Sequence, residues 1–175
     1  MKKSTNGDRI AADAQRYTRM KAAIGCAIVV TLVLQADAAP AAQIDNPEAF
    51  VKEIYAHFVA SEPKHDFAPP ADIYTPRLKA LFVRDEKWAK GEVGCLEFDF
   101  WVNGQDWELK DARVTSRPVA GHADRTVVIA TFLNLGTANE LHFDFQKIAG
   151  KWLLDDVHSV GGERWTLSKI LNCPH

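Results

Sequence analysis

The sequence has no apolar run long enough to cross a membrane as a helix. Its apolar run from Ala22 to Leu34 has 13 residues, whereas a membrane-spanning helix needs about 20. We therefore expect no permanent membrane span. An excess of positive charge is missing as well, since 21 basic residues stand against 23 acidic ones. Nucleic-acid-binding domains usually carry a basic patch or stripe, so nucleic acid is not an expected partner.

The sequence also lacks the short motifs that mark a catalytic nucleophile, a phosphate-binding loop or a zinc site. It has no Gly-x-Ser-x-Gly nucleophile motif. The Gly-containing segment Ser159 to Glu163 lacks the Lys-Ser/Thr of a phosphate-binding loop. No two Cys or His residues fall at the short spacing that zinc ligands usually show. We expect no nucleophilic triad, no metal and no cofactor.

What is present near the N-terminus has the pattern of a secretory signal peptide. Met20 and Lys21 precede the apolar run, and Ala36 to Pro40 follow it as a small-x-small exit. Residues 1–38 are therefore predicted to be a signal peptide, with Met20 as an alternative start, and 39–175 a single exported domain in the periplasm or outside the cell. The alternative is a buried helix of a cytosolic domain.

Cysteines are few, and their positions predict one disulfide. The sequence has three cysteines. Cys26 lies in the predicted signal peptide and is removed with it, so that Cys95 and Cys173 remain. Two thiols in an oxidising compartment are expected to pair, closing a loop of nearly 80 residues. The alternative is two unpaired thiols.

Helix signals occupy the first half of the exported part. Asn46 and Pro47 form a cap signature before apolar residues at three- and four-residue spacing, which predicts a helix to about Ala60. Thr75 and Pro76 repeat the signature before a second helix that Gly91 and Gly94 end.

From Leu96 onward the apolar period changes to two, which predicts strands. The order is α+β: N-terminal helices packed on a curved antiparallel sheet of about five strands, a cone with a pocket at its mouth. A short helix is expected at the end, over Trp165 to Leu171. The predicted strands are Leu96 to Trp101, Trp107 to Val114, Thr126 to Leu133, Leu141 to Gln146 and Trp152 to Val157.

Two segments resemble an exported bacterial family, domain of unknown function 3828. They are Tyr74-Thr75-Pro76-Arg77-Leu78, which opens the second predicted helix, and the stretch from Leu96 to Trp107 with its Leu96-x-x-Asp99 and Gln105-Asp106. The resemblance implies a fold similar to the nuclear-transport-factor-2-like or cystatin-like cones and a periplasmic or lipid-anchored setting in Gram-negative bacteria. It implies no established reaction. This chain has no lipidated cysteine at the start of its exported part.

The densest polar group surrounds the predicted turn at Asn103-Gly104. It consists of Asp99, Gln105 and Asp106, flanked by Trp101 and Trp107. Two carboxylates and an amide beside exposed indoles could hold a cation, a sugar or a peptide edge. The alternative is that Asp106 bonds the backbone of its own turn and that both indoles belong to the core.

A second group lies at the end of the last long predicted strand. Alternation places Asp156 and His158 on one face and Asp155 on the other, so of these residues only Asp156 and His158 could pair. The alternative is a solvated strand end. His57 and His142 are too far apart in sequence to propose a shared metal.

These observations lead to two hypotheses about function. The first is a small periplasmic or secreted binding module that engages a protein or envelope component through Trp101 to Glu108. An immunity or inhibitor protein is one version of it, because the exported part has 15 basic and 20 acidic residues and would suit a basic toxin. The second is a small-molecule enzyme of isomerase or hydratase type, with Asp99 or His142 pointing into an enclosed pocket.

Overall fold

The computed structural model describes residues 43–60, 69 and 71–174, all within the compact unit Ala38–His175. The predicted signal peptide lies outside the described residues. Among these residues no helix is both long and apolar enough to cross a membrane. The elements are α1 (Pro47–Ala60), the 3-10 helix η1 (Ala71–Ile73), α2 (Pro76–Ala89), β1 (Leu109–Val119), β2 (His122–Asn134), β3 (Thr137–Ile148), β4 (Lys151–Ser159), β5 (Trp165–Thr166) and α3 (Leu167–Ile170).

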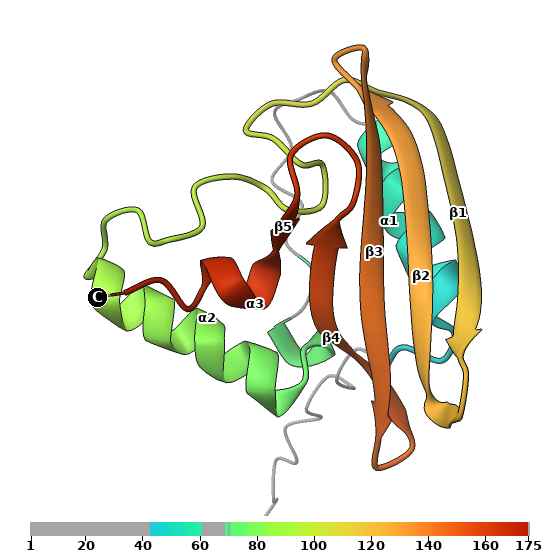
Figure 1. Ribbon diagram of the computed structural model, residues 1–175, viewed down its shortest axis with the longest axis horizontal. Coiled ribbons are helices and arrows are strands. Elements are labelled where there is room, and N and C mark those ends of the chain that lie inside the picture. The colour runs from blue at the N-terminus through green and yellow to red at the C-terminus, as the bar shows by residue number, and fades with distance from the viewer. Residues whose placement is uncertain (1–42, 61–68, 70, 175) are drawn as a thin grey trace, which may run out of the picture. The chain divides into compact units, whose positions relative to one another are not determined.

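The strands form one open antiparallel sheet in the order β1-β2-β3-β4-β5. Helix α1 lies behind β1 and β2 in the view of Figure 1, and α2 lies beside β4 and α3. The predicted α+β class with helices before a five-stranded antiparallel sheet is confirmed, and the arrangement is consistent with a cone-like fold.

Helix α1 begins where its cap signature predicts. The Asn46 side chain accepts a hydrogen bond from the Ala49 backbone N–H at 3.1 Å, and Pro47 takes the first helical position. The inward face of the helix packs on the β1–β2 side of the sheet because its apolar residues recur at helical spacing. The buried residues of α1 are Pro47, Val51, Ile54, Tyr55 and Phe58.

Helix α2 also begins as predicted, and its first turn is tied to β4. Thr75 Oγ1 accepts the Leu78 N–H at 3.2 Å and donates to Asp155 Oδ1 at 2.8 Å. Arg77 Nε donates to the same Asp155 oxygen at 3.2 Å. The helix ends at Lys90 and Gly91, both with positive φ.

The first predicted strand, Leu96 to Trp101, is wrong. These residues form bends and turns with one isolated bridge between Asp99 and Gly104. Phe100, Trp101 and Val102 are all buried, whereas a strand would turn successive side chains to opposite faces. The fifth strand is instead β5, at the start of the segment predicted as a helix, whose remainder is α3.

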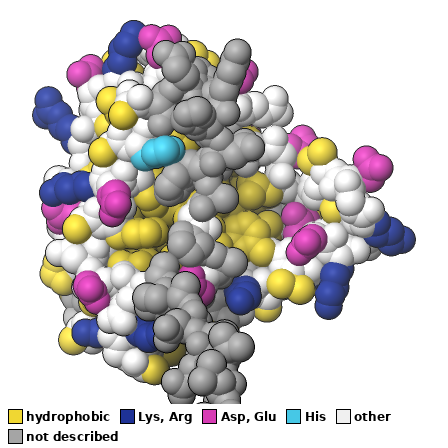
Figure 2. All heavy atoms as spheres, turned by 180° about the vertical axis from the view of Figure 1, so that it is seen from behind, with side chains coloured by type: hydrophobic (Ala, Val, Ile, Leu, Met, Phe, Trp, Pro, Cys, Tyr) yellow, Lys and Arg dark blue, Asp and Glu magenta, His cyan; other side chains and the backbone are white. Residues whose placement is uncertain are grey.

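Aromatic rings link the two long helices through this irregular segment. Phe50 of α1 lies 6.5 Å from Trp101 between ring centroids, and Phe82 of α2 lies 6.3 Å from Phe100. The rings of Phe100 and Trp101 are 5.0 Å apart. Figure 2 shows hydrophobic side chains gathered in the middle of the face seen from behind, with charged side chains toward its outline.

Candidate functional site

Three connecting segments meet at one end of the sheet, at the top of Figure 1. They are residues 103–108, the β2–β3 hairpin at residues 134–139 and the Gly161–Glu163 segment after β4, which we call the loop end. An open hollow of about 310 Å³ lies among them. Its lining residues are Asn103, Gly104, Asn134, Leu135, Thr137, Ala138, Asn139, Gly161, Gly162 and Glu163.

A second, larger hollow adjoins the first. It has a volume of about 630 Å³ and shares Ala138, Asn139 and Gly161 with the smaller one. Arg113 of β1 and Glu140 of β3 bring charged groups to its rim. The loop end and the neighbouring strand surface therefore form a continuous concavity on the protein.

One buried amide holds the first segment of the loop end in place. Asn134 is 7 % exposed, and its Nδ2 donates to the backbone oxygens of Val102 at 3.0 Å and Asp106 at 3.1 Å. Its Oδ1 accepts the Glu108 N–H at 3.0 Å. Because these bonds satisfy three backbone groups at once, the segment has a defined conformation without belonging to a strand.

A second amide joins the same segment to two other strands. Asn103 has a left-handed backbone, φ 54°, which asparagine tolerates better than most residues. Its Nδ2 donates to Asn139 Oδ1 at 2.7 Å, and its Oδ1 accepts the Trp165 indole N–H at 2.8 Å. The loop end is thus fixed from beneath by side chains of β3 and β5.

The predicted polar group is divided by the turn instead of being assembled by it. Asp99 is half-buried, and its Oδ1 accepts the Trp101 backbone N–H at 2.8 Å. Gln105 and Asp106 are exposed, and Gln105 Nε2 donates to the Glu97 backbone oxygen at 3.2 Å. No hydrogen bond joins Asp99 to either side chain in the described part of the chain. Asp106 is held through its backbone oxygen, by Asn134.

Asp99 sits in a desolvated position beside two tyrosines. Burial raises the pKa of Asp99, and the hydrogen bond from the Trp101 backbone opposes that change. Burial, with a smaller contribution from Asp99, raises the pKa of Tyr74 to about 12. Tyr55 donates its hydroxyl to the Trp101 backbone oxygen at 2.8 Å. These groups face inward and support the segment from the core side.

Of the two possibilities for the indoles, exposure or a place in the core, Trp101 takes the second and Trp107 lies between them. Trp101 is 2 % exposed and stacks on Phe143 with ring centroids 5.0 Å apart. Trp107 is half-buried, with its ring edge-on to Phe58 at 5.5 Å. The Nε1 atoms of both indoles are buried and have no hydrogen-bond partner among the residues that the structure describes. The core therefore uses Trp101 as a packing residue.

Carboxylates outnumber cationic groups around the hollows. Residues 103–113 and 160–164 together with Glu140 carry five carboxylates, Asp106, Glu108, Asp111, Glu140 and Glu163, against Lys110, Arg113 and Arg164. Glu108 is paired with Lys110 at 2.6 Å. Asp106 and Glu163 have no ion-pair partner among the described residues.

Asp156 and His158, which could have paired with each other, have other hydrogen-bond partners. His158 Nε2 lies 2.7 Å from Asp144 Oδ2 on β3, and its Nδ1 lies 3.2 Å from Thr166 Oγ1 on β5. The hydrogen bond to Asp144 raises the pKa of His158. Asp156 instead accepts hydrogen bonds from Ser168. Cross-strand register, which was not known from the sequence, decides these partners.

His142 lies on the same face as His158, directly opposite it on β3. Its Nε2 is 2.7 Å from Glu140 Oε1. Its strand neighbours Leu141 and Phe143 are buried in the core, so His142 points away from the interior.

Sequence reasoning missed the residues that shape the loop end. Asn134 and Asn139 lie just outside the predicted strands, in the parts of β2 and β3 next to the hairpin turn, where buried amides carry no periodic signal. Leu135 and Glu163 are exposed loop residues. The signals for these loops in the sequence were the glycines beside them, Gly136 after Leu135 and Gly162 before Glu163.

Comparisons with known proteins do not assign a family. No family model matches the sequence, and no curated protein is significantly similar to it. Among solved structures, the chain is similar to a phospholipid-binding protein from Ralstonia solanacearum determined in complex with a phospholipid. The identity is 19%, the match covers 71% of this chain and 68% of that chain, and the TM-score is 0.27.

Proposed function

We propose that this protein is a small exported binding module that engages a protein or envelope component through the loop end. The observation that carries the proposal is the preorganised acidic segment at residues 103–108. Asn134 fixes its backbone by three hydrogen bonds, while Gln105 and Asp106 remain exposed. A segment that is already ordered loses little conformational entropy when it binds.

Export is supported by two independent features. The segment from Met20 to Pro40 has the order of charge, apolar residues and small residues that signal peptidase substrates share. Cys95 and Cys173 form a disulfide, which is typical of oxidising compartments. We infer a periplasmic or secreted location from both.

The partner's chemistry follows from the charge at the loop end. Five carboxylates against three cations favour a basic segment of a protein. An immunity or inhibitor protein that neutralises a basic effector is the specific form we propose. Exposed Leu135 at the tip of the β2–β3 hairpin would add an apolar contact.

The core packing supports binding over the enzyme alternative. Phe100, Phe143 and Phe145 are buried in the interior, where an enclosed catalytic pocket would have to lie. His142 points away from that interior. Neither Asp99 nor His142 therefore faces an enclosed apolar pocket bounded by described residues.

We also propose that the resemblance to the domain of unknown function 3828 family reflects a common fold. In this chain the Thr75-Pro76-Arg77-Leu78 motif caps α2 and ties it to Asp155. A structural role of this kind would suit a motif shared by proteins with different partners. A solved member in which the motif neither caps a helix nor contacts a strand would contradict this proposal.

The function is tested with two carboxylates at the loop end and one elsewhere. Asp106→Ala combined with Glu163→Ala removes two carboxylates without an ion-pair partner among the described residues, and Asp124→Ala removes an equally exposed carboxylate of β2 near the opposite end of the sheet. Each variant is expressed at endogenous level, recovered from the cell envelope and analysed by native mass spectrometry. We expect the partner adduct to disappear only in the double variant.

Two outcomes would overturn the proposal. An adduct that persists in the double variant would place binding elsewhere on the protein. A protein recovered without any adduct, combined with turnover of a small molecule by the same preparation, would favour the enzyme alternative.

A further inference from the structure

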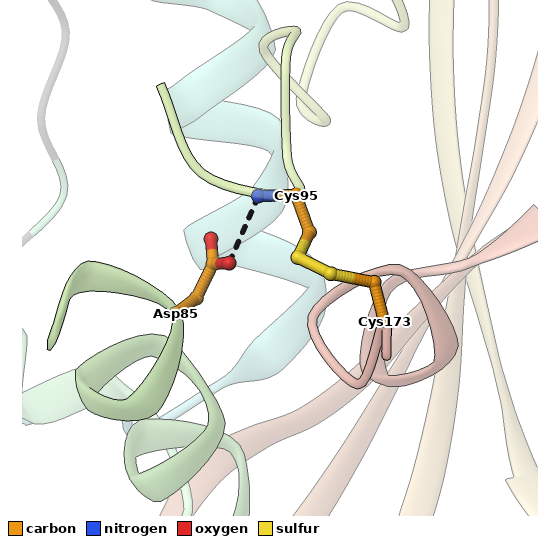
Figure 3. A group of neighbouring side chains, drawn as sticks. All are labelled: Asp85, Cys95 and Cys173. Carbon is orange, nitrogen blue, oxygen red and sulfur yellow. Dashed lines mark hydrogen bonds between the residues drawn. A yellow bond between two sulfur atoms is a disulfide. The ribbon is translucent and has the colours of Figure 1, made fainter. Parts of the chain in front are cut away.

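The fold brings Asp85, Cys95 and Cys173 together from three separate parts of the chain (Figure 3). Asp85 lies on α2, Cys95 in the segment after it and Cys173 beyond α3. One ligand atom from each, a carboxylate oxygen and two sulfurs, lies within 4.8 Å of the others. The cysteines are 78 residues apart in sequence and are joined as a disulfide.

Asp85 is a buried carboxylate without a counter-charge. It is 7 % exposed, and it has no ion-pair partner in the part of the chain that the structure describes. Its Oδ1 accepts the Cys95 backbone N–H at 2.8 Å. An unpaired buried carboxylate is costly, so a cation bound beside it would relieve that cost.

The backbone around both cysteines is held by bonds that do not involve the disulfide. The Cys95 N–H is bonded to Asp85, and the Cys173 N–H donates to the Ile170 oxygen at 3.1 Å. Arg84, next to Asp85, donates to the Leu171 backbone oxygen at 3.1 Å and to the Asn172 side chain. Because none of these contacts uses a sulfur atom, we expect the two thiols of the reduced protein to stay near each other and near Asp85.

We propose that the reduced protein binds one divalent metal ion of the zinc class through Cys95 Sγ, Cys173 Sγ and a carboxylate oxygen of Asp85. Two thiolates and one carboxylate are ligands that zinc commonly accepts, and solvent completes a tetrahedral set. Two sulfurs bound to one zinc ion lie about 3.8 Å apart, given a Zn–S distance of about 2.3 Å. The Cα atoms, 6.2 Å apart, accommodate this small separation of the sulfurs.

The conversion between the two states is a balanced redox and acid–base process. A dithiol reductant supplies two electrons and two protons, so that the S–S bond breaks, two thiols form and the reductant becomes a disulfide. Zinc then displaces both thiol protons to solvent, and two Zn–S bonds and one Zn–O bond form. In either state the same three parts of the chain stay joined.

This inference is independent of the loop-end binding proposal, because it uses none of those residues. It implies that the chain has a covalent link in an oxidising compartment and a metal link in a reducing one. The experiment uses the purified protein, oxidised or reduced without oxygen, with Co²⁺ as the probe. Thiolate-to-cobalt charge transfer gives an absorption band that reports sulfur ligation directly, and zinc competition shows that both metals use one site.

We expect a band of one-to-one stoichiometry in the reduced protein and none in the oxidised protein. Cys95→Ser and Cys173→Ser should each abolish the two-thiolate band. Asp85→Asn keeps the side-chain shape and should raise the Kd for Co²⁺ about tenfold or more. Glu86→Gln, the matched control at the next and exposed position of α2, should leave the Kd unchanged.

Three results would overturn the proposal. If the reduced protein gives no thiolate-to-cobalt band, it has no such site. This holds whether or not circular dichroism shows that the reduced protein is folded. The thiols would bind metal without the folded arrangement if Asp85→Asn had the same Kd for Co²⁺ as the native reduced protein. The same would follow if the urea-unfolded chain gave a band as strong as that of the folded protein. Asp85 would then serve only to anchor the Cys95 backbone.

Discussion

The two long helices are attached to the rest of the protein by different interactions. α1 fully buries four apolar side chains besides Pro47, and these pack against the sheet. α2 fully buries only Leu78 and Asp85. Besides the partly buried Leu81 and Phe82, its attachment is polar, through Thr75 and Arg77 to Asp155, and the Cys95–Cys173 disulfide lies beside Asp85.

This difference shows that similar helix signals in a sequence do not imply similar energetics. Burial of apolar area contributes continuously along α1, about 25 cal/mol for each Å² removed from water. The polar contacts of α2 are few and local, so each one can be removed separately. α2 should therefore open locally more readily than α1.

Loss of the disulfide should have the largest effect on stability. Replacing Cys95 and Cys173 together by Ser frees a loop with a sequence separation of 78, which should lower the free energy of unfolding by about 4 kcal/mol. Urea denaturation measures the loss. Hydrogen exchange should show that protection of backbone amides falls more in α2 than in α1. An equal fall in both helices would contradict the proposed difference in how they are attached.

Truncation of one buried side chain of α1 should come next. Ile54→Ala leaves a cavity against the sheet and should lower the free energy of unfolding by about 3 kcal/mol, with the whole domain affected. The neighbouring exposed Glu53 provides the control, since Glu53→Ala should change stability by about 0.5 kcal/mol or less. If Ile54→Ala cost no more than its control, α1 would not be held by apolar burial.

Removal of the polar anchor of α2 should have a smaller effect. Thr75→Val keeps the side-chain shape but loses the bonds to the Leu78 N–H and Asp155, which should cost about 1–2 kcal/mol. Lys79→Ala, on the exposed face of the same helix, is the control. Exchange rates should rise in the first turn of α2 and stay constant in α1. A uniform rise would show that the anchor serves the whole fold.

The smallest effect should come from the His158–Asp144 pair, which touches neither long helix. Hydrogen bonding to Asp144 raises the folded-state pKa of His158, so the stabilisation is fully present below the unfolded-state pKa of about 6.5. It is lost as the pH rises through the folded-state pKa. Both side chains are partly exposed, so solvent screening keeps the effect small.

The measurement is an NMR titration of His158 in the native protein and in Asp144→Asn. The pKa of His158 should lie above its ordinary value in the native protein and return toward it in the variant. A pKa that is the same in both proteins would contradict the assigned pairing. Exchange rates of α1 and α2 should be unchanged, which makes this pair a reference for the other three predictions.

Both helix starts, the hairpin strands and the Cys95–Cys173 link follow from local pattern and from the small number of cysteines. The segment from Leu96 to Trp101 does not, although its alternation is clear in the sequence. Asp99 caps a turn at the Trp101 N–H, and three successive buried residues follow it. Here tertiary packing overrides the two-residue period.

The candidate site was predicted only in part. Gln105 and Asp106 are exposed where the turn signal placed them, but Trp101 belongs to the core. Asn134 could not be identified, because a buried amide that bonds three backbone groups of another segment leaves no periodic mark in its own strand. Such contacts depend on which segments become neighbours.

The sequence by itself determined the starts of the two long helices, the antiparallel order of the hairpin strands and the cysteine pair, since each depends on residues close in the chain or on a choice among very few partners. Tertiary structure alone decided that His158 pairs with Asp144 and that Asp85 joins the two cysteines. Strand register and helix packing set these distances, and a bulge of one residue in β4, between the Asp144 and Phe145 pairings, changes which side chains share a face.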